Sequence, residues 1–429
     1  MFGKFKGRYG EKKVKKNDRD VMSYEDMPLE DYELEKTEMS PVAVKKVILC
    51  VCIALAAGLV VFAFANRDRL TPQSIANWWT YDVLGNAGNG YPVDLVGTEV
   101  SSENFVVTDG RAAYASDTSF VTLSATGSEI ANIQLKYSSP IMVNKGNMFL
   151  TFGLGGTGFQ VNTLDKQLYV GESEEKIYAA DIASNGVYAF VTEGNGYLST
   201  LWVYNDDNNR IYKYSFSEYY ITAVTLNSDG SGCVATGFSS DNGAVVSGVY
   251  VLDFKKEEPQ QMIVIPDDVI IACRHLSNNR IALVGESASY VIKKGEEDYI
   301  TDSYNDMTLS NYTFNPDTSS YAVALSRSGD GRSCTVMIYN SNGELSSKVE
   351  TESRADSLSM YKDKVALLDG NTACVYNTKG TDLYKSDVGT GSKRLILSSD
   401  STAYVLSVNQ VRFFDFNSTS TEDTANSIV

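Results

Sequence analysis

The sequence predicts an all-β fold, a β-propeller of eight four-stranded blades that follows one transmembrane helix. Two observations predict the propeller. A short sequence pattern, an apolar run followed by a polar turn, recurs every 37 to 48 residues, and we call it the repeated phrase. Between its copies lie other short alternating runs separated by Asn, Asp and Gly, with no convincing amphipathic helix. An uncharged run of nineteen residues near the N-terminus predicts the membrane helix.

Charge and cysteine usage exclude several classes of function. The 429 residues include 37 Lys and Arg against 54 Asp and Glu, a net charge of −17. Nucleic-acid binding needs a basic footprint, so no nucleic-acid partner is expected. Outside the apolar run, four cysteines lack CxxC pairs and disulfide-like spacing, and we expect buried free thiols. They are Cys233, Cys273, Cys334 and Cys374.

Residues 1–44 are expected to form a disordered cytoplasmic tail. Residues 1–16 carry seven basic residues against one Glu, and residues 23–38 carry seven acids against one Lys. Such charge blocks cannot bury enough apolar surface to fold. The basic block is suited to the anionic inner leaflet and the acidic block to a cytoplasmic partner. The alternative is a solvated tail that only helps to fix topology.

Residues 45–66 are expected to form a single plasma-membrane crossing. The run "VILCVCIALAAGLVVFAFA" at 47–65 spans roughly 28 Å as a helix, close to a hydrocarbon core of about 30 Å. Lys45 and Lys46 precede it and Arg67 follows it. A cleaved signal peptide is the alternative, but both the preceding segment and the apolar run are too long for one. We expect a retained anchor with the N-terminus cytoplasmic and the propeller extracytoplasmic.

Residues 67–101 are expected to link the anchor to the propeller. A Thr-Pro pair at 71–72 predicts a short helix that carries Trp78 and Trp79 on one face. Both indoles either lie at the outer membrane interface or pack under the propeller. The β-like run "YPVDLVG" follows at 91–97. We expect it to supply the outer strand of the final blade, because the last repeat has no fourth strand of its own.

Residues 102–416 are expected to form the propeller, followed by a disordered tail at 417–429. Copies of the repeated phrase start at 120, 159, 201, 249, 290, 336, 374 and 411. Residues 219–265 show the internal order, four short strands joined by polar turns. Thin sheets of this kind cannot bury both faces alone, so they stack radially and close into a ring. Seven blades are the alternative, because the first and fifth copies are degenerate.

No catalytic constellation, cofactor motif or metal-ligand pattern is evident, and no cofactor is expected. His275 is the only histidine, and we expect it where an inner strand meets its turn, in a structural role. "LGGTG" at 154–158 and "NDDNN" at 205–209 are expected to be hairpin turns rather than phosphate or calcium loops. The many acidic residues leave a carboxylate pair acting on glycans open as an alternative.

The stretches "SDTSFVTLSATGSEI", "GGTGFQVNTLDKQLYVGESE" and "YLSTLWVYNDDN" resemble domain-of-unknown-function family 5711. The resemblance covers about 70–416. It implies a single-pass bacterial membrane protein with a short cytoplasmic tail and an extracytoplasmic propeller-like domain, and it brings no catalytic residues.

The function expected from these features is a non-catalytic binding or scaffold module for a cell-envelope protein, peptide or glycan. One alternative is an envelope glycan hydrolase that uses paired carboxylates. Another is a ligand sensor that relays to the cytoplasmic tail.

Overall fold

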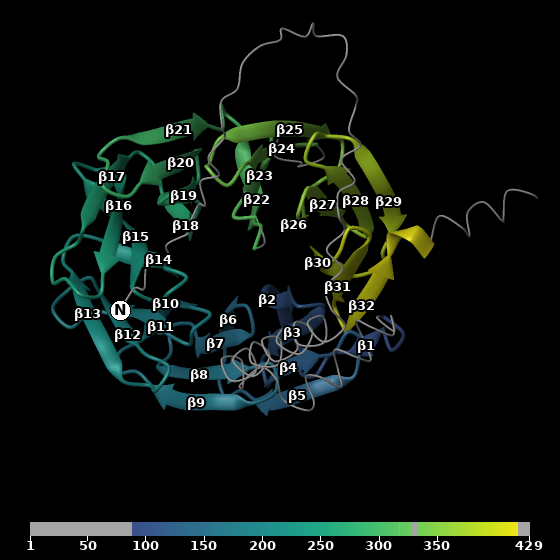
Figure 1. The fold of residues 1–429 in the computed structure, drawn as a ribbon, viewed down its shortest axis with the longest axis horizontal. Coiled ribbons are helices and arrows are strands. Elements are labelled where there is room, and N and C mark those ends of the chain that lie inside the picture. Colours follow the sequence, from purple (N-terminus) through teal and green to yellow (C-terminus); the bar gives the residue numbers. More distant parts are fainter. Residues whose placement is uncertain (1–87, 317, 328–332, 419–429) are drawn as a thin grey trace, which may run out of the picture. The chain divides into compact units, whose positions relative to one another are not determined.

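A computed structural model describes residues 88–316, 318–327 and 333–418. These residues form eight four-stranded antiparallel sheets that fan around a common axis (Figure 1). The prediction of an eight-bladed propeller is therefore confirmed, and the alternative of seven blades is wrong. Every predicted copy of the repeated phrase lies in the third strand of a blade or overlaps it.

Within each blade the strands follow one another from the channel outward. Blade 1 comprises β2 Val100–Thr108, β3 Arg111–Ser116, β4 Ser119–Leu123 and β5 Glu129–Gln134, and blade 2 comprises β6 Pro140–Lys145, β7 Met148–Gly153, β8 Gly158–Thr163 and β9 Gln167–Glu172. Blade 3 comprises β10 Ile177–Ile182, β11 Tyr188–Glu193, β12 Ser199–Tyr204 and β13 Arg210–Phe216, and blade 4 comprises β14 Tyr220–Leu226, β15 Gly232–Asp241, β16 Ala244–Asp253 and β17 Gln261–Pro266. Blade 5 comprises β18 Ile270–His275, β19 Arg280–Gly285, β20 Ala288–Lys293 and β21 Tyr299–Ser303, and blade 6 comprises β22 Thr308–Phe314, β23 Tyr321–Ser326, β24 Cys334–Tyr339 and β25 Leu345–Thr351. Blade 7 comprises β26 Ser357–Tyr361, β27 Lys364–Asp369, β28 Thr372–Asn377 and β29 Asp382–Asp387, and blade 8 comprises β30 Ser392–Leu397, β31 Thr402–Ser407, β32 Gln410–Asp415 and β1 Val93–Asp94.

The last blade is completed by the start of the described chain. Val93 of β1 pairs with Val411 of β32, and Asp94 pairs with Gln410, in antiparallel register. Tyr91, just before β1, packs edge-on against Tyr404, with ring centroids 5.4 Å apart. The predicted closure of the ring by 91–97 is therefore confirmed.

The hydrophobic core lies between blades rather than within them. Each of eight clusters of buried side chains draws its members mainly from two neighbouring blades. Middle strands are covered on both faces, so the residues of β11 and β23 are almost all buried. Outer strands such as β9 instead mix exposed and half-buried residues. Burial of one large apolar side chain stabilises the fold by roughly 1.5–3 kcal/mol. Because each blade buries these side chains against its neighbours, no blade is stable without them.

Polar side chains also tie neighbouring blades together. Asn104 of blade 1 donates to the Pro140 carbonyl at 2.7 Å and accepts the Met142 amide at 2.9 Å in blade 2. Ser357 of blade 7 accepts the Leu395 amide of blade 8 at 3.2 Å. These bonds satisfy inner-strand groups that have no partner within their own sheet. The ring is consequently a rigid frame for its loops.

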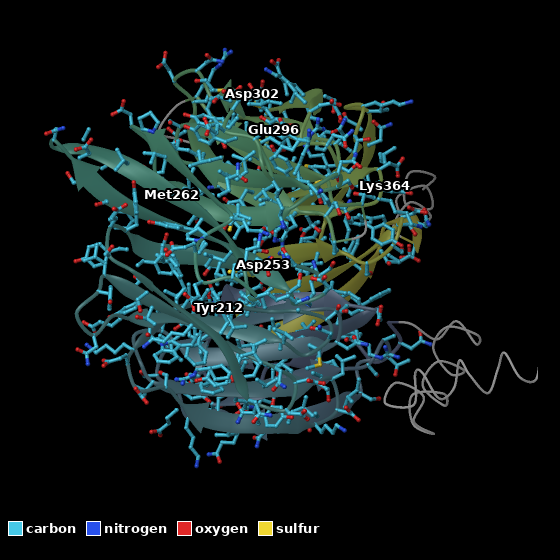
Figure 2. The ribbon with its side chains drawn as sticks, turned by 60° about the vertical axis from the view of Figure 1, so that its left-hand side comes forward. Tyr212, Asp253, Met262, Glu296, Asp302 and Lys364 are labelled. Atoms are coloured by element: carbon cyan, nitrogen blue, oxygen red, sulfur yellow. The ribbon has the colours of Figure 1, made fainter. Side chains whose placement is uncertain are left out.

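The outermost strands form the circumference. Figure 2 labels Tyr212 of β13 and Met262 of β17, which belong to neighbouring blades. Met262 is exposed, whereas the Tyr212 ring packs 5.0 Å from that of Phe254. The outer strands carry their exposed apolar side chains spaced around the ring, from Val170 in β9 to Leu383 in β29. Apolar residues scattered in this way do not mark a site.

Several smaller predictions are confirmed. Cys233, Cys273, Cys334 and Cys374 are buried free thiols. Residues 154–157 and 205–209 form the turns between β7 and β8 and between β12 and β13.

The membrane predictions concern residues outside the described ranges. None of the helices described is long and apolar enough to cross a bilayer. The run at 47–65 and the predicted linker helix lie outside these residues, so the crossing stays a prediction. A helical turn at 416–418 follows β32, and the rest of the predicted C-terminal tail is likewise outside.

Candidate functional site

The meander gives the propeller two distinct faces. In each blade, the turn between the second and third strands lies on the same side as the connection to the next blade. We call this side the connection face. Loops on a rigid frame are where propellers and other all-β folds carry recognition residues.

Exposed apolar side chains gather on one half of the connection face. Seven large residues there are between 38% and 53% exposed, and they come from four consecutive blades, 2 to 5. We call this set the apolar arc. Its members are Leu154, Tyr178, Tyr197, Tyr220, Phe238, Val245 and Ile271.

Hydrogen bonds show that the segments carrying the arc are adjacent. The Gly155 amide donates to the Ile177 carbonyl at 2.8 Å, which places the turn of Leu154 beside the strand of Tyr178. In the same way, the Ile221 amide donates to Ser199 Oγ at 3.0 Å, linking the start of β12 to that of β14. Segments of the arc are therefore neighbours across the boundaries between blades 2 and 3 and between blades 3 and 4.

Blade 4 extends the arc beyond the rim of its neighbours. Strands β15 and β16 each have ten residues, whereas the second and third strands of the other blades have five or six. The extension turns at Asn242 and Gly243, both with positive φ, as two-residue hairpins require. It carries Phe238, whose ring centroid lies 6.3 Å from that of Tyr220.

Acidic side chains surround the arc. The turns, connections and strand ends of blades 2 to 5 on this face carry exposed carboxylates at Glu174, Glu193, Glu218, Asp241, Asp267 and Glu286. Lys176 lies among them and is ion-paired with Glu193 at 3.9 Å. The arc is therefore an apolar surface with a strongly negative rim.

The central channel is a second candidate site with a different character. A cavity of about 400 Å³ is lined by residues of all eight blades, mostly on the inner strands. Six of those strands shift register by a β-bulge, which re-aims side chains near the axis. The charged lining residues are Glu103, Asp181, Arg274, Asp356, Lys393 and Arg394.

The three channel carboxylates come from separate blades, and two of them accept backbone amides. They come from blades 1, 3 and 7, so no two of them share a blade or lie on neighbouring blades. Asp356 accepts the Gly370 amide at 2.8 Å and pairs with Arg354 at 3.5 Å. Asp181 is buried and accepts the Leu226 amide at 2.8 Å, and burial raises its pKa.

His275 ends strand β18, where the sequence predicted it. Burial, followed by repulsion from Lys294, lowers its pKa to about 3. The ring is therefore neutral at physiological pH. Its Nε2 atom has no hydrogen-bond partner among the described residues, and this residue does not line the channel cavity.

The predicted membrane-interface residues cannot be placed against either site. Lys45, Lys46, Arg67, Trp78 and Trp79 lie outside the described residues. Sequence reasoning missed the arc and the channel cations. The apolar residues in Gly-rich turns, Leu154 and Tyr197, were the available signal for the arc.

The chain resembles one protein family and, among solved structures, a WD40 domain and BamB. The model of a family of unknown function, DUF5711, matches residues 90–414. The C-terminal WD40 domain of Sif2 is 10% identical over 77% of this chain and 98% of its own, with a TM-score of 0.55. BamB from Moraxella catarrhalis is 12% identical over 76% of this chain and 100% of its own, with a TM-score of 0.48. No curated protein matches the chain.

Proposed function

The chain belongs to the DUF5711 family of unknown function, and we propose that it is a non-catalytic scaffold that binds an envelope protein through the apolar arc. The proposal includes an anchor at 47–65 that holds the propeller at the outer face of the plasma membrane. The uncharged run with its flanking cations supports the anchor. The propeller fold supports a rigid platform for contacts.

The observation that carries the proposal is the one-sided distribution of the arc. The propeller closes around its cores without these seven side chains, which are exposed on blades 2 to 5. Exposed apolar side chains gathered on one side of a domain are typical of interaction sites. Three of the seven are Tyr, a residue enriched among the anchors of protein interfaces.

The rim defines the chemistry of the partner. Exposed carboxylates around an apolar centre attract a surface that carries Lys and Arg around its own apolar anchors. A neutral glycan lacks that charge complement. We therefore assign the arc to a protein segment with aliphatic or aromatic side chains flanked by basic residues.

The experiment is affinity capture with the full-length, membrane-embedded protein. A triple variant, Tyr197→Ser, Tyr220→Ser and Phe238→Ser, is compared with the wild type and with Val408→Ser. Val408 is 58% exposed and lies on the opposite half of the connection face. We expect one protein to be enriched with the wild type and with Val408→Ser, and to be depleted at least tenfold with the triple variant.

Two outcomes would overturn the proposal. One is equal capture of the same partner by all three proteins. The other is recovery of no partner together with measurable cleavage of envelope glycans, which would favour the hydrolase alternative.

A further inference from the structure

The channel holds cations that the protein itself does not pair. Within the described part of the chain, Arg274 of blade 5 has no hydrogen-bond or ion-pair partner; its guanidinium lies 5.4 Å from the Phe314 ring centroid. Lys145, at the end of β6, likewise has no partner in the described ranges. A partly buried cation without a counter-ion is costly, and such groups are normally paired.

The two cations also influence one another. Burial lowers the pKa of Lys145, and the positive charge of Arg274 adds to that effect. The nearby carboxylate of Asp181 acts against this repulsion, because it raises the pKa of Lys145. Burial raises the pKa of Asp181 itself, whereas the charges of Arg274 and Lys145 lower it, and its Oδ2 accepts the Leu226 amide. Two cations thus share one carboxylate. The site therefore has an excess of positive charge that an anion would relieve.

A second arginine lines the same cavity. Arg394 of blade 8 donates through one nitrogen to the Ser102 carbonyl at 2.9 Å. The ring of Tyr312, on blade 6, also lines the cavity, and the charges of both Arg394 and Arg274 act on its hydroxyl. Guanidinium groups suit the planar, two-oxygen geometry of carboxylates and phosphates.

The channel differs in charge from the rest of the molecule. The whole chain has a net charge of −17, yet Lys145, Arg274, Lys393 and Arg394 lie in or beside the channel. Of the three carboxylates that face them, Asp356 is already paired with Arg354. The other two carboxylates, Glu103 and Asp181, act on Arg394 and on Arg274 with Lys145, respectively. Four cations therefore face two available carboxylates, and this local excess of positive charge favours a small anion.

We propose that the channel binds a small polar ligand through an oxyanion, a carboxylate or a phosphate, held by Arg274 and Arg394. The cavity of about 400 Å³ falls within the roughly 300–1,000 Å³ of small-molecule sites. Asn144 and Thr225 supply neutral polar groups around it for the remainder of the ligand. This site is separate from the apolar arc, so either proposal can fail without the other.

The test is titration calorimetry of the full chain with three anions. Inorganic phosphate, glycerol 3-phosphate and glucuronate are the probes, and glycerol and glucose are their neutral counterparts. We expect binding of at least one anion in the millimolar range or tighter, and none of the neutral compounds. The ranking of the phosphate and carboxylate probes identifies which oxyanion the channel prefers.

Variants connect the binding to the channel. Arg274→Gln is expected to weaken anion binding at least tenfold, whereas Arg280→Gln, which changes an arginine of the same blade outside the cavity, leaves it unchanged. Arg274→Lys retains the charge and should bind with intermediate strength. Should Arg274→Gln melt at a lower temperature, Lys145→Gln provides the same test. Absence of anion binding by the wild type, or binding by the Arg274 and Lys145 variants that equals that of the wild type, would overturn the proposal.

Discussion

The connection face has two halves with the same backbone plan and different surfaces. On blades 2 to 5 it presents the apolar arc and its acidic rim. On blades 6 to 8 and 1, Val408 is the only large apolar residue strongly exposed among the residues described. Polar groups there are used internally, as when Arg354 pairs with Asp369 at 3.0 Å.

The fold therefore does not require the arc. Blades of both halves close over similar cores, and both are held by side chain to backbone bonds across blade boundaries. What differs is the sequence of the turns. The polar half closes the ring through β1, and the proposed recognition surface lies on the other half.

The largest effect is expected from deleting residues 91–97, in the polar half. The deletion removes β1 and exposes a cluster that includes Tyr404 and Val411. Loss of several buried side chains should lower the melting temperature by on the order of 10 °C, because each contributes a few kcal/mol. Scanning calorimetry measures this, and an unchanged melting point would show that the ring does not depend on the closure.

Loss of the arc should have a large effect on binding and little on stability. We expect Tyr220→Ser with Phe238→Ser to weaken partner binding by roughly thirty- to a thousandfold, since interface anchors contribute about 1–2 kcal/mol each. The melting temperature should change little, because both side chains are exposed. Surface-plasmon titration with the captured partner measures this, with Val408→Ser as the matched control. If the control weakened binding as much as the arc variant, the two halves would not differ.

Acid should destabilise the blades under the arc, because the only histidine of the chain lies there. The pKa of His275 is lowered to about 3 in the fold, below an ordinary value of about 6.5. The fold favours the neutral imidazole of His275. The resulting contribution to the free energy of unfolding is complete above about pH 6.5 and is lost as the pH falls toward 3. Relative to His275→Gln, the wild type should lose about 2–3 kcal/mol of unfolding free energy by pH 4.5. Denaturant titrations at pH 7 and 4.5 measure the loss; parallel pH profiles would contradict it.

The smallest effect is expected from salt. Raising the ionic strength should weaken partner binding by a few-fold through a slower association rate, because the rim carboxylates are exposed and screened. The double variant Glu218→Gln and Asp241→Asn should show a flatter salt dependence. Stopped-flow association rates measure this, and a wild-type rate independent of salt would argue against a basic partner.

The architecture could be predicted from the sequence because its signals are local. The alternation of strands and the Asn, Asp and Gly turns repeat in each blade, and the missing fourth strand of the last repeat indicated the run at 91–97. One local signal was overlooked. The "SSDNGAVV" stretch around Asn242 and Gly243 is a hairpin pattern, and it forms the extension that carries Phe238.

The sites could not be predicted in the same way, because they depend on contacts between distant segments. Tyr220 and Tyr219 are neighbours in the sequence, yet one is 53% exposed and the other 6%. Which of them joins the arc depends on how blades 3 and 4 pack. Likewise, Arg274 has no hydrogen-bond or ion-pair partner within the described ranges. Whether it has one depends on which side chains the seven other blades place in the channel.

The most direct test of the account places a photoreactive phenylalanine analogue at position 197, on the arc, or at position 408, on the polar half, of the full-length protein in its own membrane. If the arc binds the partner, illumination yields an adduct with one protein from position 197 and none from position 408. Adducts of equal yield from both positions, or an adduct from position 408 alone, would contradict it.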